Sequence, residues 1–200
     1  MKKIKKIVAM FSALVMMMSV GITSVSAAPV HKTYTVQSVD FVKDIYGDWE
    51  RKGAIHEAGT KGESGAYFEG CKVETTSSFN ISVPIKKISA KLGYEVKKSK
   101  ISTVYASHAH DALFPGEQSA FYVRKHWKEY KIKYKVTERT SYSDGRGIQT
   151  KTKTYTKYET IKVPQEITHK DRKWFYTSKK SNKDLPSKIK ANQCKNYVCE

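Results

Sequence analysis

Three residues in one short segment, His108, His110 and Asp111, have the side chains best suited to bind a metal ion. In an extended segment residues i and i+2 point the same way, so both imidazoles could reach one Zn²⁺ or Cu²⁺, and Asp111 could add an oxygen. Further ligands would have to come from elsewhere, with His56 or His126 as the candidates. Polar loop residues, or a pH-sensitive contact, explain the same residues. The pair is a weak metal candidate, and we expect no cofactor.

The familiar signatures of catalysis do not occur in the chain. The run Gly62-Glu63-Ser64-Gly65-Ala66 misses the spacing of a nucleophile elbow, because its last glycine comes one position early. There is no phosphate-binding loop and no HExxH motif. Asp48 and Glu50 would share a strand face, but they lie in a glycine-rich stretch and are better explained as solvated charge. We therefore expect a protein that is not an enzyme and has no catalytic residue.

Lysines that recur at every second position indicate binding. Lys131, Lys133 and Lys135 would form a row on one strand face, and the lysines of the returning arm would lie beside them. Such a row attracts polyanions. The tyrosines of the arms, Tyr155 and Tyr158 among them, would supply packing or anchor the protein at the interface. The alternative is a solubilising face that blunts edge pairing. The predicted ligand- or surface-binding residues are Lys131, Lys133, Lys135, Lys151, Lys153, Lys157, Tyr130 and Tyr134.

The overall charge agrees with that surface. The chain has 200 residues, with 37 Lys and Arg against 19 Asp and Glu, and a formal net charge of +18. Four lysines lie in the first 27 residues, so a net charge of about +14 remains beyond them. Apolar residues make up 39% and aromatic residues 12%, enough for a packed core and against simple disorder. The length excludes a large multidomain enzyme.

The first 27 residues are typical of a secretion signal. Met1–Lys6 is basic, an uncharged run follows to about Ile22, and Val25 and Ala27 fit the −3 and −1 positions of a cleavage site. An uncleaved anchor is the alternative, although the run is shorter than the ~20 residues of a usual span. We expect cleavage after Ala27 and a secreted, extracellular protein, which argues against an intracellular nucleic acid as the partner.

Export makes the three cysteines candidates for disulfides. Cys194 and Cys199 could close a small ring, or either could reach back to Cys71 and tie the tail to the body. One cysteine is left over in every intramolecular scheme, which allows a disulfide-linked dimer. All three could also stay reduced, so the sequence leaves the pairing open.

Period-two alternation predicts most of the secondary structure. Val30–Val42 is a predicted strand with a break or bulge near Gln37-Ser38, and 44–70 is predicted as loops and short strands. Ile88–Val96 alternates over five apolar positions and is a predicted strand; an amphipathic helix over Ile85–Val96 is the alternative. Ile101–Ala106 is β-rich, and 108–116 is a predicted loop.

Two long arms follow. Phe121–Tyr142 and Thr150–Val163 are predicted strands, joined by a turn within Ser141–Gly147, and Lys173–Thr177 could dock a last strand. Pro164 would end the second arm. We expect an all-β fold, an elongated antiparallel sheet or sandwich with long hairpin arms. Its expected domains are a signal peptide at 1–27, one all-β domain at 28–177, and a basic, Cys-containing C-terminal tail at 178–200, of which Ser178–Lys190 is expected to be mobile.

The strands carry two resemblances. Residues 75–177, with the run Ser-Phe-Asn-Ile-Ser-Val, the segments 90–96 and 114–117, and arms that end at Val163-Pro164, resemble small uncharacterised secreted β-rich proteins of Gram-positive bacteria. That group implies no activity. More distantly, the strand pattern resembles aerolysin-type (ETX/MTX2-like) β-pore-forming proteins, whose amphipathic hairpin enters membranes. This resemblance implies a membrane hairpin within Phe79–Ala106, at residues Ile88, Leu92, Tyr94 and Val96.

The leading hypothesis from the sequence is a secreted, non-enzymatic, cationic β-protein. Its partner would be an anionic cell-wall polymer or an anionic lipid surface, bound through the cationic arms. The alternative hypothesis is a membrane-permeabilising, β-pore-forming-like protein that would act as a homo-oligomer. The first hypothesis predicts binding that weakens steeply with salt, and the second predicts leakage from vesicles.

Overall fold

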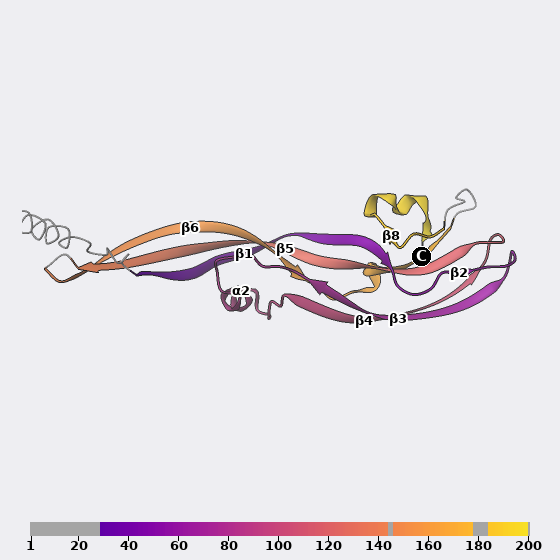
Figure 1. Cartoon of the computed structure of the whole chain (residues 1–200), viewed down its shortest axis with the longest axis horizontal. Helices are drawn as coiled ribbons and strands as arrows, with labels where there is room; N and C mark the ends of the chain where they lie inside the picture. The colour runs from indigo at the N-terminus through magenta and orange to yellow at the C-terminus, as the bar shows by residue number, and fades with distance from the viewer. Residues whose placement is uncertain (1–28, 144–145, 178–183, 200) are drawn as a thin grey trace, which may run out of the picture. The chain divides into compact units, whose positions relative to one another are not determined.

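The structure is a computed structural model that describes residues 29–143, 146–177 and 184–199. These residues form antiparallel sheets and one short α-helix, so the all-β prediction is confirmed (Figure 1). The predicted signal peptide lies outside the described residues. The chain divides into two compact units, one made of 1–32 with 138–153, and a larger one made of 33–137 with 154–200.

The smaller unit contains the end of the long hairpin. The hydroxyls of Ser141 and Thr150 lie 3.4 Å apart across it. Lys32 forms an ion pair with Glu138 at 2.9 Å. The predicted turn within 141–147 includes residues 144 and 145, which lie outside the described residues. Among the described residues of this unit, Val30, Tyr142 and Ile148 are 50%, 47% and 81% exposed, so these apolar side chains form no buried core.

The larger sheet is built around one strand, β5. β1 lies along one side of β5, while β6 and β7 pair with its other side; the main strand order is β8-β1-β5-β7-β9, with β2 also paired to β5. The predicted arms are confirmed as β5 and β6, and the predicted last strand as β7. The strands of this sheet are β1 (Val30–Arg51), β2 (His56–Glu57), β5 (Gln118–Ser143), β6 (Ile148–Pro164), β7 (Arg172–Tyr176), β8 (Lys188–Ile189) and β9 (Val198–Cys199).

The smaller sheet consists of β3 (Ser64–Thr76) and β4 (Ser99–Asp111), which are antiparallel. Their pairing runs without interruption from Ser64 opposite Asp111 to Thr76 opposite Ser99. Two predictions for this region are wrong. The stretch 44–70 is largely strand, because β1 continues to Arg51 and β3 begins at Ser64; and β4 includes the predicted loop residues 108–111.

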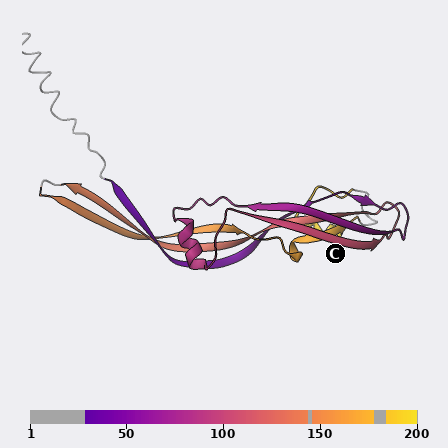
Figure 2. The same ribbon diagram turned by 90° about the horizontal axis from the view of Figure 1, so that it is seen from below.

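The predicted strand at Ile88–Val96 is also wrong, and the helical alternative is correct. The helix α2 covers Ile85–Leu92 and ends at Gly93, which has a φ of 78° and donates its N–H to the Ser89 carbonyl. Glycine adopts this left-handed conformation at little cost. Ile88 is fully buried, while Ala90 is exposed, so the apolar spacing that matters is helical. Figure 2 shows α2 lying across the strands that it covers.

Three apolar clusters line up along β5. Phe121 and Val123 pack against β3 and β4, and Ala120 and Tyr122 pack on the opposite face against residues of the C-terminal segment. Further along, Tyr130, Ile132, Tyr134 and Val136 pack against α2 and its flanking segments. Within β1, Val36 and Val39 both pack on this last cluster, which requires the extra residue that was predicted near Gln37-Ser38.

The C-terminal segment is not a free tail over the residues that the structure describes from 184 onward. Leu185 is 2% exposed and Ile189 is fully buried, and both belong to the cluster around Trp49 and Tyr122. Ile189 pairs with Trp49 across β8 and β1, and the Arg51 side chain donates to the Leu185 carbonyl at 2.9 Å. Two 3-10 helices complete the fold, η1 (His169–Asp171) and η2 (Ala191–Asn196).

Candidate functional site

The lysine row predicted on β5 exists, on the face opposite the core. Lys131 and Lys135 are exposed and Lys133 is half-buried, while Ile132 and Tyr134 between them are fully buried. This is the expected result of strict alternation along a strand that is covered on one side. Successive lysines of the row are about 7 Å apart along the strand. The row is therefore a regular line of positive charge within the larger unit.

Lys157 of β6 does not join this row, which corrects the prediction for that residue. Tyr155, Ile161 and Val163 pack into the α2 cluster, so the odd-numbered residues of β6, Lys157 among them, belong to the core-facing side. The Lys157 ammonium lies 5.9 Å from the centre of the Tyr155 ring. Lys151 and Lys153 are exposed and belong to the smaller unit.

The tyrosines predicted at the surface divide into two groups. Tyr130 is 7% exposed and Tyr134 is fully buried, so the assignment of both to the binding surface is wrong. Burial raises the pKa of each phenol to about 12, and for Tyr130 a hydrogen bond with Tyr94 adds to the effect. Tyr158 is the tyrosine on the lysine face: it is 58% exposed, and the Lys131 ammonium lies 5.3 Å from its ring centre.

The rest of this face is polar and carries little negative charge. Thr154, Thr156 and Thr160 alternate with the core residues of β6 and are exposed. Thr154 meets Thr137 of β5 at 3.4 Å, hydroxyl to hydroxyl, which fixes these positions on the same face. Glu129, two residues before Lys131, is paired with Lys43 at 3.8 Å. We call the surface formed by Lys131, Lys133, Lys135, Thr154, Thr156, Tyr158 and Thr160 the lysine face.

A groove adjoins the lysine face at Trp127. Its volume is about 440 Å³. Trp127 belongs to the same odd-numbered side of β5 as Lys131, and Thr160 belongs to the same side of β6 as Tyr158. This site was not predicted from the sequence, although an aromatic residue in phase with the lysine row was the available signal. The residues that give the groove its chemistry are Thr76, Ser77, Ser78, Trp127, Thr160 and Lys162.

The predicted histidine pair forms part of an aromatic cluster between β4 and β7. The rings of His108 and His110 lie 5.6 Å apart, as expected for residues i and i+2 of a strand, and His108 stacks on Trp174 at 5.3 Å. His56, one of the two ligands suggested from elsewhere, lies in the same cluster at 6.1 Å from Trp174. The other, His126, lies elsewhere, stacked on Tyr46 at 4.5 Å.

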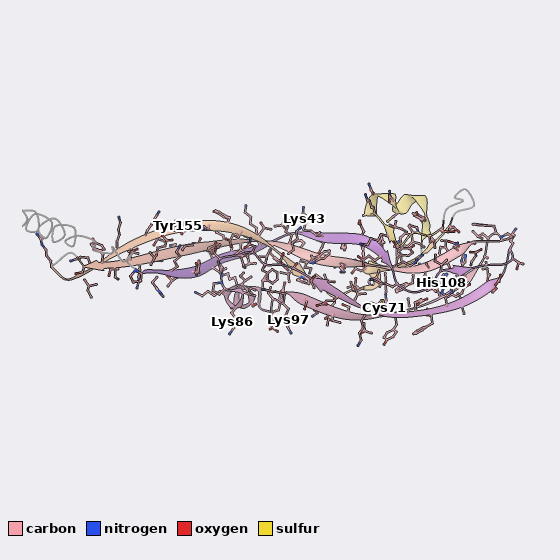
Figure 3. The ribbon with its side chains drawn as sticks, viewed as in Figure 1. Lys43, Cys71, Lys86, Lys97, His108 and Tyr155 are labelled. Atoms are coloured by element: carbon pink, nitrogen blue, oxygen red, sulfur yellow. The ribbon has the colours of Figure 1, made fainter. Side chains whose placement is uncertain are left out.

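Each histidine of the cluster has a protein partner at Nε2. His108 shares a hydrogen bond with the Tyr176 hydroxyl, His110 lies 2.7 Å from the buried carboxylate of Glu117, and His56 lies 3.3 Å from Glu69. Among the residues that the structure describes, no three His, Cys, Asp or Glu side chains are placed to hold a metal ion. These contacts join the smaller sheet to the larger one (Figure 3 labels His108), so their evident role is structural.

The residues predicted for a membrane hairpin do not form one. Ile88 and Leu92 belong to α2, and Tyr94 and Val96 belong to the segment that follows it. Val96 is 5% exposed, and the Tyr94 hydroxyl meets that of Tyr130 at 2.9 Å. Within the described part of the chain, no helix has the length and apolar character needed to cross a membrane.

Two of the three candidate disulfide residues have described side chains. Cys71 and Cys194 are both free thiols of intermediate exposure. Cys71 lies on β3 (Figure 3), and burial raises the pKa of its thiol. The side chain of Cys199 lies outside the described side chains. No disulfide therefore joins Cys71 to Cys194.

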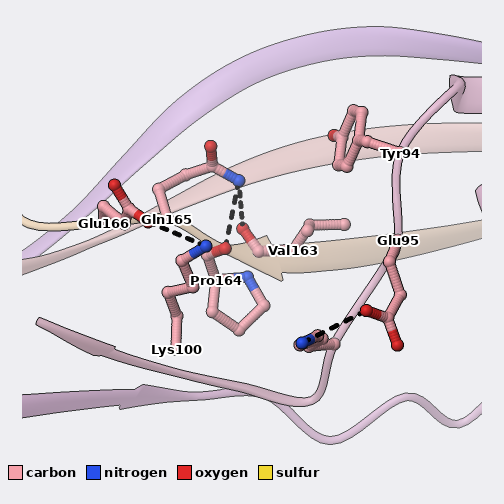
Figure 4. Close-up of a pocket in the computed structure, with 8 residues that line it drawn as sticks. Tyr94, Glu95, Lys100, Val163, Pro164, Gln165 and Glu166 are labelled. Atoms are coloured by element: carbon pink, nitrogen blue, oxygen red, sulfur yellow. Dashed lines mark hydrogen bonds and ion pairs between the residues drawn. The ribbon is translucent and has the colours of Figure 1, made fainter.

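A cavity of about 430 Å³ lies where β6 ends, but its charges are already paired (Figure 4). Lys100 forms an ion pair with Glu166 at 2.8 Å, and Lys97 forms one with Glu95 at 3.1 Å. The Gln165 amide donates to the Val163 carbonyl at 3.1 Å. The polar groups that line this cavity mostly serve one another, so the lysine face and its groove are the stronger candidate site.

Comparison with known proteins adds no assignment: no family model, no curated protein and no solved structure matches this chain.

Proposed function

We propose that this protein is secreted and binds a linear anionic polymer of the cell surface through the lysine face, without catalysis. The observation that carries the proposal is the row Lys131, Lys133 and Lys135, held outward on a strand whose alternate residues are core. A rigid row needs no reorganisation to meet a polymer with an anionic group at roughly 7 Å intervals. The net charge of about +14 that remains beyond residue 27 supports attraction to such a polymer at longer range.

The composition of the face favours a polymer over a lipid surface. Proteins that bind at a membrane interface bury apolar side chains among the lipids. Here the positions around the lysines are occupied by threonines, with Tyr158 as the aromatic residue. Hydroxyls and ammonium groups suit a hydrated, phosphate-bearing chain.

The test measures binding of the full mature chain to poly(glycerol phosphate) and, in parallel, to vesicles of phosphatidylglycerol and phosphatidylcholine. Both probes carry a glycerol phosphate, so the comparison separates a free polymer from a lipid headgroup. We expect tighter binding to the polymer, and affinity that falls steeply as salt rises through about 0.1 M. Tighter binding to vesicles would contradict the polymer proposal.

The decisive variant replaces Lys131, Lys133 and Lys135 with Gln. At about 1 kcal/mol for each lysine near an anionic surface, affinity should fall on the order of 100-fold. The matched control replaces Lys86, Lys91 and Lys98 with Gln, which removes the same charge from exposed positions in and after α2. An equal loss in both variants would mean that net charge, and not this face, governs binding.

The alternative from the sequence, membrane permeabilisation, depended on an amphipathic hairpin whose residues the structure places in α2 and the following segment. Dye release from the same vesicles tests it directly. We expect no release, and release at low protein concentration would replace the polymer proposal with the permeabilising one.

A further inference from the structure

We propose that the groove beside Trp127 binds a saccharide, so that the polymer on the lysine face is a sugar-substituted one. This inference rests on the proposed function and specifies its ligand. The groove's volume of about 440 Å³ lies within the range of about 300–1,000 Å³ that is usual for small-molecule sites. It holds an aromatic ring, several hydroxyl groups and one ammonium group.

Trp127 is fixed in place as a platform. Its indole N–H donates to the Thr76 carbonyl at 2.9 Å. A Cβ at Gly47 would lie 3.5 Å from the ring's Cζ3, so the ring packs closely over the β1 backbone. Trp127 is partly exposed, whereas Trp49 and Trp174 are 3% and 5% exposed. An ordered, partly exposed indole can stack on the C–H face of a sugar ring with little loss of side-chain entropy.

The hydroxyl groups around the ring suit the polar edge of a saccharide. Thr76, Ser77, Ser78 and Thr160 surround the groove, and each hydroxyl can both donate and accept a hydrogen bond. The lining includes Lys162 and no carboxylate. Sugar hydroxyls need both donors and acceptors of hydrogen bonds. The Lys162 ammonium can in addition pair with a phosphate next to the sugar.

The groove continues into the lysine face, which links the sugar to the anionic backbone. Trp127 and Lys131 lie on the same side of β5, while Thr160 and Tyr158 lie on the same side of β6. A sugar stacked on Trp127 would therefore leave the polymer's phosphates beside Lys131 and the lysines beyond it. Neutral glycans lack the charge for the lysine face, and unsubstituted polyphosphates lack the ring for the groove.

The experiment compares two forms of poly(glycerol phosphate), one plain and one with glucosyl substituents, on the full mature chain. We expect about tenfold tighter binding of the glucosylated form, and a shift of tryptophan emission that the plain form does not cause. Equal affinity for the two forms would overturn the saccharide inference but leave the polymer proposal intact. Failure of both forms to bind would overturn the polymer proposal and the saccharide inference with it.

Two variants locate the preference. Trp127→Leu should bind both forms with the affinity that wild type has for the plain form. The double variant Ser78→Ala, Thr160→Val changes only exposed positions, so we expect it to fold even if Trp127→Leu fails to fold. It should lose most of the tenfold preference for the glucosylated form. Thr103→Val, at an exposed position of β4 outside both the lysine face and the groove, is the matched control and should keep it. A preference that survives the double variant would refute the groove as the subsite.

Single-stranded DNA is the competing ligand, because bases also stack on tryptophan and phosphates also meet lysines. An oligothymidylate therefore serves as the third probe at the same salt concentration. We expect it to bind more weakly than the glucosylated polymer. Tighter binding that is lost in Trp127→Leu would replace the saccharide with a nucleobase.

Discussion

The two parts of β5 differ in how many of their faces are covered. Every residue from 118 to 123 is buried, because β3 and β4 cover one face and the C-terminal segment covers the other. From 130 to 136 the strand alternates, because α2 and its flanking segments cover a single face. One strand therefore serves as the centre of a three-layer core and, further along, as the base of a displayed surface.

The difference shows how a small chain obtains a rigid binding surface. The side chains of the lysine face are exposed and do not hold the strand in place. Its rigidity comes from the α2 cluster packed on the other face of β5, and from residues 118–123, where both faces of β5 are covered. The sequence reflects this directly: residues 119–123 are nearly all apolar or small, while 130–136 alternate tyrosine, isoleucine and valine with lysine.

The largest effect is expected at high pH, because buried tyrosines occur in both parts of β5. Burial raises the pKa of Tyr122, Tyr130 and Tyr134 from 10.0 to about 12. Above pH 10 the unfolded chain loses these protons while the folded chain keeps them, so their contribution to stability is complete below pH 10 and is lost as pH rises towards about 12. Unfolding free energies measured by urea titration over this pH range should fall steeply. Tyr134→Phe should make the fall shallower, and an unchanged slope would contradict the assignment.

Substitutions in the first part of β5 come next in size. Phe121→Ala and Tyr122→Ala alter opposite faces of the strand, and the two residues are 1% and 0% exposed. Each should lower the free energy of unfolding by about 3–5 kcal/mol. Urea unfolding measures both, and a near-neutral result for either one would mean that its face is not covered.

In the second part of β5, neighbouring residues should behave differently. Ile132→Ala should cost about 2–5 kcal/mol, since the side chain is fully buried. Lys131→Ala should change stability by no more than about 0.5 kcal/mol, because its ammonium is exposed and only loosely associated with Tyr158. Equal costs at the two positions would remove the contrast between core and displayed face.

A smaller cost than that of Ile132→Ala is expected in the element that covers this second part. Gly93 ends α2 with a φ of 78°, so Gly93→Ala should destabilise the protein by about 1 kcal/mol. In a strand the same change would remove a flexible residue and would be stabilising or neutral. The sign of the change, measured by urea unfolding, therefore distinguishes the helix from the strand.

Much of the fold could be predicted because alternation is a local property. The lysine row and the two long arms follow from residue spacing alone. The strand was preferred to the helix because Ile88, Ala90, Leu92, Tyr94 and Val96 alternate by coincidence: Ala90 and Tyr94 are exposed, and the buried positions follow the helical spacing instead. The spacing of residues along the chain does not show which apolar side chains are buried against other elements of the fold.

The candidate site was harder to predict because it depends on how strands are paired. The assignment of Lys157 to the lysine face failed, since the register between β5 and β6 places odd residues of one strand beside even residues of the other, as Thr137 and Thr154 show. Likewise, nothing in the sequence near Lys188 and Ile189 reveals that they pair with β1. Trp127 could not be assigned to a groove from the sequence, because the groove exists only where the fold places Thr76 and Thr160 beside it.

The pairing of β1 with β8 has a kinetic consequence. Arg51 and Leu185 are 134 positions apart, and Trp49 has its strand partner at Ile189. During synthesis from the amino end, β1 lacks its β8 partner until residues 188 and 189 have been made. Contacts across such distances make folding slow, and unpaired strands are prone to associate in the meantime. The residues from Leu185 to Ile189 are thus needed before β1 has all its partners, and truncation before Leu185 should leave an aggregation-prone intermediate.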